Sequence, residues 1–339
     1  MGLLAGSHKS MEATSSLMTH HDVNLILATG GSGLVKAAYS SGKPAYGVGP
    51  GNVPVYIHET ANVKKAVSMI VDSKSFDQGT ICASEQAIVA DRAIYDEAIR
   101  ELQARGAYLL SQAEKSELEK VISPAPGKIN PKIVGKSAAF IAGIAGITVK
   151  DEVRVLVAEE TIIGKEIPFS LEKLSPVLAL YKAEKYDHAK ELCTKLLDLG
   201  GRGHSFSIHS SDEKVVKEFS LELPVSRILV NTLATIGAVG GTTGLAPSFT
   251  LGCGTFGGNI TGDNITARHL FNVKRVAYGT KETVIPPKGS LMIPEKRKSV
   301  EDETNKIIHD VIKSLEKREQ VNLDEISAIV SAIMLQIAK

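Results

Sequence analysis

Residues 24–52 read NLILATGGSGLVKAAYSSGKPAYGVGPGN, and this stretch decides the fold class. The apolar run 24–29 predicts a strand, and the glycines after it predict a turn. Residues 32–41 then follow a helical pattern, and residues 44–48 predict a second strand. The stretch therefore predicts a β-α-β unit.

The same alternation continues along the chain. NVKKAVSMIVDSKSF has an apolar helical face, and EQAIVAD is typical of a buried strand. AIYDEAIRELQARG, which follows, predicts a helix that ends at Gly106. Strand patterns return in VRVLVAE, PVLALYKA and SRILVNT, and the long coil GAVGGTTGLAPSFTLGCGTFGGN is rich in glycine. Alternating strands and helices predict an α/β fold, and long coils in compact folds are usually functional sites.

Composition excludes several classes of partner. The 339 residues carry 39 Lys and Arg against 38 Asp and Glu, which leaves a formal charge of +1. No net field favours nucleic acid or an anionic membrane, and no apolar run approaches the roughly 20 residues that span a bilayer. The three cysteines are not paired in spacing and indicate a reducing compartment. We expect a cytoplasmic protein that binds neither nucleic acid nor membrane.

The pattern changes along the chain predict five segments. These are residues 1–76, residues 77–262, residues 263–285, a proline-rich linker at 286–298 and an amphipathic helical tail at 299–339.

Cys82 stands in FDQGTICASEQ, among small and polar residues. A partly exposed cysteine near a positive charge or a helix N-terminus forms a reactive thiolate most easily. A free cysteine is also commonly a small buried hydrophobic residue, and the residues alone leave both interpretations open. Cys193 lies in an apolar helical pattern and is expected in the core, whereas Cys253 is a weaker nucleophile candidate.

The turn ATGGSGLVKAA places glycines between a strand and a helix. Backbone N–H groups and the helix dipole can face a phosphate there, but a tight turn needs the same residues, so both interpretations stay open. His204 and His209 have no partner in metal-ligand spacing, and we expect no metal site. His20 and His21 are interpreted as solvated residues.

Five stretches in order resemble the CoA-acylating aldehyde dehydrogenases. They are residues 24–52, SFDQGTICASEQ, EKLSPVLALY, GGRGHSFSIHS and LAPSFTLGCGTFGGNITGDNITARHLFNVKRVA. The resemblance runs from about Ser10 to Tyr278 and is strongest to the aldehyde dehydrogenase part of bifunctional aldehyde-alcohol dehydrogenases and to the acylating enzymes of bacterial microcompartments. It implies an aldehyde-dehydrogenase-like α/β fold in which residues 1–76 form a partial NAD-binding domain, residues 77–262 a catalytic domain and residues 263–285 a return and oligomerisation segment.

The resemblance also implies roles for individual residues. Cys82 matches the family nucleophile, whose thiolate adds to a small aldehyde. The adduct gives a hydride to NAD, and the resulting thioester passes its acyl group to coenzyme A. His204 matches a histidine near the reacting centre. Glu172 matches the acid that holds the nicotinamide ribose. The other cofactor-binding residues it implies are Thr29, Gly30, Gly31, Gly33, Gly47 and Gly49.

Gly47 carries a second implication. In the segment matching YGVGPGN, hydrolytic aldehyde dehydrogenases have a glutamate that deprotonates water, and Gly47 stands at that position here. Acyl transfer to the CoA thiol is then favoured over hydrolysis. A crowded backbone also selects glycine, and both reasons are compatible.

Whole members of the family have well over a hundred residues before the segment that matches this chain from about Ser10. We therefore expect an incomplete Rossmann-type cofactor domain. An alternative function is a catalytically inactive subunit or microcompartment cargo module that acts through its tail. The tail from Ser299 carries an apolar helical stripe, resembles encapsulation peptides, and implies shell or cargo partners inside a microcompartment. The family also implies a homo-oligomer.

Overall fold

The computed structural model describes residues 10–285 and residues 306, 309 and 313. The chain divides into two units, Met1–Asn272 and Val273–Lys339. In the second unit, residues 273–285 contain neither helix nor strand. The predicted linker at 286–298 and the predicted tail, apart from the three single residues, lie outside the described residues.

The first unit begins with helix α1 (Met11–Thr19) and then the predicted β-α-β unit. Strand β1 (Ile26–Thr29), helix α2 (Ser32–Ser40) and strand β2 (Ala45–Val48) follow one another, and the two strands form a small parallel sheet. The prediction for residues 24–48 is confirmed, with strand ends that differ by one or two residues.

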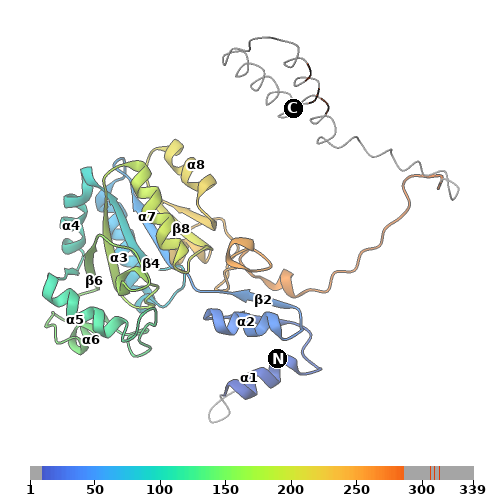
Figure 1. Ribbon diagram of the computed structural model, residues 1–339, viewed down its shortest axis with the longest axis horizontal. Coiled ribbons are helices and arrows are strands. Elements are labelled where there is room, and N and C mark those ends of the chain that lie inside the picture. Colours follow the sequence, from blue (N-terminus) through green and yellow to red (C-terminus); the bar gives the residue numbers. More distant parts are fainter. Residues whose placement is uncertain (1–9, 286–305, 307–308, 310–312, 314–339) are drawn as a thin grey trace. The chain divides into compact units, whose positions relative to one another are not determined.

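A second sheet of seven strands forms the body of this unit (Figure 1). All of its neighbouring strands pair in parallel. The order is β5-β6-β7-β4-β3-β8-β9. The strands are β3 (Val53–Ile57), β4 (Glu85–Asp91), β5 (Ala107–Leu109), β6 (Val155–Glu160), β7 (Val177–Ala183), β8 (Gly203–His209) and β9 (Val225–Val230).

Helices cover both faces of the seven-stranded sheet. Helices α3 (Val63–Ser75) and α4 (Tyr95–Ala104) share one apolar core with it. The other face packs against α5 (Gln112–Ile122), α6 (Ala138–Ile144), α7 (Tyr186–Asp198) and α8 (Glu213–Glu222). A parallel sheet covered on both faces explains why its central strands read as continuous apolar runs. The predicted α/β class is confirmed.

The boundary between the two sheets falls between Val48 and Val53. The sequence placed the domain boundary at 76, which assigned β3 and α3 to the cofactor part. In the structure β3 pairs with β4 and β8, and α3 packs on the same sheet. The roles of the five predicted segments stay predictions.

Gly47 of β2 lies under helix α2. A Cβ atom at position 47 would stand 2.6 Å from Val35 Cγ1 and 2.7 Å from Tyr39 Cε2. The Gly47 N–H also donates to the Tyr39 hydroxyl at 3.0 Å. The crowded backbone that the sequence allowed for is therefore present, because any side chain at this position would collide with α2.

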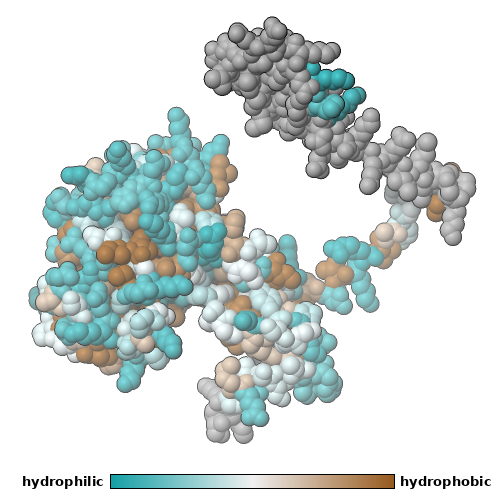
Figure 2. Space-filling view, in the orientation of Figure 1, coloured by the Kyte–Doolittle hydropathy of each residue, from teal (hydrophilic) through white to brown (hydrophobic). Residues whose placement is uncertain are grey.

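The visible face of the seven-stranded part carries mostly hydrophilic side chains, with smaller apolar patches between them (Figure 2). Among the residues that the structure describes, none of the helices combines the length and the apolar character that a membrane crossing needs.

We expect Gly47→Ala to lower the free energy of unfolding by about 1–3 kcal/mol, the usual cost of overpacking. Gly49→Ala is the matched control, because a Cβ at position 49 would meet no atom within 4 Å. Urea unfolding of both variants measures the difference. Equal stability of the two would contradict the packing role of Gly47.

Candidate active site

Cys82 and His204 meet at the amino-terminal edge of the seven-stranded sheet. Cys82 lies just before β4, and His204 is the second residue of β8. Strand β3 runs between them and pairs with both. The Cys82 Sγ lies 3.1 Å from His204 Nε2, and His204 Nδ1 lies 3.0 Å from the Ser205 hydroxyl.

Gly51, just before β3, allows this meeting. A Cβ at Gly51 would stand 2.2 Å from the Cys82 carbonyl oxygen and 3.0 Å from His204 Cγ. Backbone and imidazole already fill the space that a side chain would need. Glycine is the residue type that lets another backbone approach this closely.

Both reactive groups are neutral in the resting structure. Burial raises the pKa of the Cys82 thiol to about 12, and the charges of Glu172 and Cys253 raise it further, whereas that of Arg227 lowers it. Burial, aided by Arg227, lowers the pKa of His204 to about 3. Near pH 7 a thiol therefore faces an imidazole, which can accept its proton at Nε2.

Glu172 lies beside this pair. Its Oε1 accepts a hydrogen bond from the Gly51 N–H at 2.9 Å. Burial raises the pKa of Glu172 to about 7, although the Gly51 bond and the charges of Lys74 and Lys173 oppose the rise. The carboxyl group can therefore exchange a proton near neutrality.

Gln86 and Lys173 connect the nucleophile segment with the Glu172 segment. The Gln86 side-chain oxygen accepts from the Lys173 N–H at 3.0 Å, and its amide donates to the Ser84 carbonyl at 3.2 Å. The Lys173 ammonium donates to three backbone carbonyls, those of Gln86, Phe169 and Leu171. Sequence reasoning missed both residues; a fully buried Lys next to Glu172 was not readable from an apolar pattern.

The three cysteines have different surroundings. Cys82 is half-buried, whereas Cys193 and Cys253 are buried. Cys193 sits in α7, so its predicted core position is confirmed. Burial raises the pKa of Cys253, which a hydrogen bond from the Gly49 backbone and the charge of Arg227 oppose. Cys253 thus belongs to the surroundings of the reactive pair.

The predicted phosphate-facing turn lies between β1 and α2. Thr29, Gly31 and Gly33 are exposed, and Gly30 is half-buried. Gly31 is the N-cap of α2 and makes no side-chain hydrogen bond to it. A Cβ at Gly31, Gly33 or Gly49 would meet nothing within 4 Å, so open space lies in front of this backbone.

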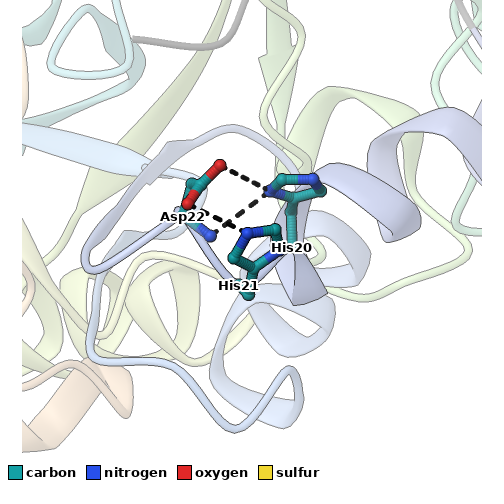
Figure 3. Close-up of side chains that lie close together, drawn as sticks. All are labelled: His20, His21 and Asp22. Atoms are coloured by element: carbon teal, nitrogen blue, oxygen red, sulfur yellow. Dashed lines mark hydrogen bonds and ion pairs between the residues drawn. The ribbon is translucent and has the colours of Figure 1, made fainter.

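His20, His21 and Asp22 form a further group of ligand-type side chains after α1 (Figure 3). Their ligand atoms lie within 4.8 Å of one another. Asp22 contacts His20 at 3.8 Å and His21 at 3.1 Å, and all three are exposed. They show the solvated surroundings that the sequence indicated for the two histidines.

A model of the aldehyde dehydrogenase family matches residues 3–127. The aldehyde-alcohol dehydrogenase of Streptococcus pneumoniae is 45% identical over 276 residues, which cover 79% of this chain and 31% of that protein. The crystal structure of an acetylating aldehyde dehydrogenase from Geobacillus thermoglucosidasius is 54% identical with a TM-score of 0.80, and the match covers 83% of this chain and 62% of that one. The chain is a homologue of the acylating aldehyde dehydrogenases.

A further relative of solved structure shows chemistry at a cysteine. The propionaldehyde dehydrogenase of Rhodopseudomonas palustris was crystallised with bound CoA and an acylated cysteine. It is 32% identical with a TM-score of 0.68, and the match covers 74% of this chain and 56% of that one. The chain therefore spans about a third of the aldehyde-alcohol dehydrogenase and less than two thirds of these two relatives of solved structure.

The surroundings of Cys82 predict how it reacts with a neutral alkylating reagent. Because its pKa is raised to about 12, the thiolate is scarce near pH 7, and its fraction grows about tenfold with each pH unit up to that value. We expect the rate with iodoacetamide to rise steadily between about pH 7 and 9. Peptide mass mapping should place the label on Cys82, and Cys82→Ser should remove it. A rate that levels off near pH 7 would contradict the burial of the thiol.

Proposed function

We propose that the chain carries the reactive centre for NAD- and CoA-dependent oxidation of a short-chain aldehyde to an acyl-CoA. The 3.1 Å contact between Cys82 Sγ and His204 Nε2 is the observation that carries the proposal. A thiol next to a neutral imidazole is the arrangement that activates a cysteine nucleophile.

His204 starts the reaction as a base. With its pKa lowered to about 3 it is unprotonated, so Nε2 can take the Cys82 proton as the sulfur forms a bond to the aldehyde carbonyl carbon. The product is a thiohemiacetal on Cys82. Its new hydroxyl carries the proton that left Cys82. Loss of a hydride from the carbon, together with return of the hydroxyl proton to His204 Nε2, turns the adduct into a thioester. A second thiol then attacks the thioester and takes the acyl group, and its proton passes to the departing Cys82 sulfur.

NAD, when bound, is the acceptor of the hydride, and CoA brings the second thiol. The turn between β1 and α2 fits a dinucleotide phosphate, because the exposed Gly31 and Gly33 leave open space before the first turn of the helix. Thr29, Gly30 and Gly49 border the same turn and the following segment. Glu172, held by the Gly51 N–H, is proposed to bind the nicotinamide ribose.

Acyl transfer rather than hydrolysis follows from the groups around Cys82. Gly47 has no proton acceptor, and its neighbours Val35 and Tyr39 leave no room for one. Among the described residues, Glu172 is the carboxyl group that acts on the Cys82 sulfur, and it is bound to the Gly51 N–H and half-buried. Water at the thioester then lacks the free carboxylate base that hydrolytic enzymes use, whereas the CoA thiol is a stronger nucleophile once ionised.

Cys82 should carry an acyl group after the intact chain is incubated with propionaldehyde and NAD in the absence of CoA. Mass spectrometry of the peptide that contains Cys82 measures the expected mass increase, and added CoA should remove it. Cys193→Ala, a change inside α7, should leave labelling unchanged, whereas Cys82→Ala should abolish it. A label on Cys253 would overturn the assignment, and no label on any cysteine would favour the alternative role as an inactive subunit.

We expect the acyl group to be transferred to CoA much more often than it is hydrolysed to the free acid. With CoA present, we expect acyl-CoA to exceed free acid by at least about tenfold, since a missing general base typically costs a factor of 10²–10⁴. Chromatography of both products measures the ratio. Comparable amounts would mean that Glu172 serves as a base for water, and Glu172→Gln should then suppress the free acid.

A further inference from the structure

Arg227 of β9 is buried next to the backbone of His204 and is only 3% exposed. Its guanidinium donates four hydrogen bonds, to the carbonyl of His204 at 3.2 Å, to the side-chain oxygen of Asn264 at 2.7 Å, and to the carbonyls of Gly252 and Gly262 at 2.8 and 2.9 Å. All four acceptors are neutral oxygens. The full positive charge is therefore not cancelled by the atoms that bind it.

Asp263 is the carboxylate with an electrostatic effect on Arg227, but it does not form an ion pair with it. Its side chain is 74% exposed and lies 3.5 Å from His269. Two further groups among the described residues act on the Cys82 sulfur, namely the Glu172 carboxylate and, when ionised, the Cys253 thiolate. Each raises the pKa of Cys82 and so disfavours its thiolate. Among the causes resolved at Cys82, Arg227 supplies the one charge that favours the thiolate.

An unpaired cation in the interior is costly unless it serves a purpose. Arginine is the residue suited to this position because its guanidinium stays protonated when buried. A buried lysine of the same protein behaves differently from arginine. Burial lowers the pKa of Lys74 to about 7, so this lysine loses half of its charge near neutrality.

We propose that Arg227 is the fixed positive charge of the reactive centre, which orients His204 through its backbone carbonyl and stabilises the negative form of the Cys82 sulfur. Arg227 is a positioning residue, since its guanidinium binds the segment that carries His204. The inference deepens the proposed function and rests on Cys82 as its nucleophile. Sequence reasoning passed over this charge in SRILVNT, although a lone arginine in an apolar strand is itself a signal.

A purely structural role is the competing explanation, because the same four hydrogen bonds tie β9 to β8 and to the loop at 252–264. Asn264 separates the two explanations. Asn264→Asp places a carboxylate next to the guanidinium and cancels its charge while the arginine stays in place. Asn264→Ala is the uncharged control: both changes remove the amide bonds to Ala238 and Ala246, and only Asn264→Asp adds a charge while it keeps the oxygen that accepts from the Arg227 guanidinium.

The readout is the rate at which iodoacetamide labels Cys82 in the intact chain, without aldehyde, NAD or CoA. His204 remains neutral between about pH 7.5 and 9.5, because burial is the larger cause of its lowered pKa, so the rate reports on the sulfur. Losing one favourable charge raises a thiol pKa by about one pH unit. The thiolate fraction then falls about tenfold, and its greater intrinsic nucleophilicity reduces the net loss to about threefold.

We therefore expect Asn264→Asp to slow labelling about threefold relative to Asn264→Ala at each pH. Arg227→Met should slow it to the same extent, while Arg202→Met, which changes a half-exposed arginine paired with Asp198, should not. Circular dichroism checks that each variant is folded, and the Asn264 pair decides the question if Arg227→Met unfolds. Equal rates for Asn264→Asp and Asn264→Ala overturn the proposal.

The same labelling assay distinguishes this proposal from the proposed function. A charge-dependent labelling rate without acylation of Cys82 by aldehyde and NAD would remove the function and keep the role of Arg227. Acylation of Cys82, with equal labelling rates for Asn264→Asp and Asn264→Ala, would keep the proposed function and remove the role of Arg227.

Discussion

The reactive centre depends on one close approach, that of the Gly51 backbone to the Cys82 carbonyl and the His204 ring. Strand β3 lies between β4 and β8, so the segments that enter these three strands must share one edge of the sheet. A side chain on the central segment would push the outer two apart. Because Gly51 has only a hydrogen atom in place of a side chain, the Cys82 sulfur and the His204 imidazole come within hydrogen-bonding distance. The Gly51 N–H then donates to Glu172.

The strand-and-helix alternation was readable because parallel strands buried on both faces are apolar along their whole length. Residues 24–48 were predicted to within two residues from their own apolar runs and from the glycines that mark the turn, although β1 is buried on one face only. The separation into two sheets was not readable. Nothing in the apolar runs says that β3 pairs with β4 and β8 rather than with β2, since pairing is decided by contacts between residues far apart in the chain.

The reactive pair was reached through family resemblance, because Cys82 alone was open to two interpretations and His204 is 122 residues away in the chain. Local patterns reveal which residues are buried, but they do not reveal which buried polar groups meet. Gln86, Lys173 and Arg227 escaped notice for this reason: each makes at least one hydrogen bond to a backbone group of a distant segment. Gly47 and Gly51 show the reverse, since the sequence displayed both glycines while the structure supplies the atoms that require them.

The interior around Cys82 contains charges of both signs that do not cancel in pairs. Burial raises the pKa values of Cys82 and Glu172 and lowers those of His204 and Lys74, so burial favours the neutral form of each of these groups. Arg227 is the exception, because a guanidinium cannot shed its proton in this way. A centre in which every group but one can become neutral has its electrostatic potential set by that one group. Negative charge that develops on the sulfur, or on the oxygen of an attacked carbonyl next to it, therefore forms in a field that is already positive, and no reorganisation of solvent is needed to create that field.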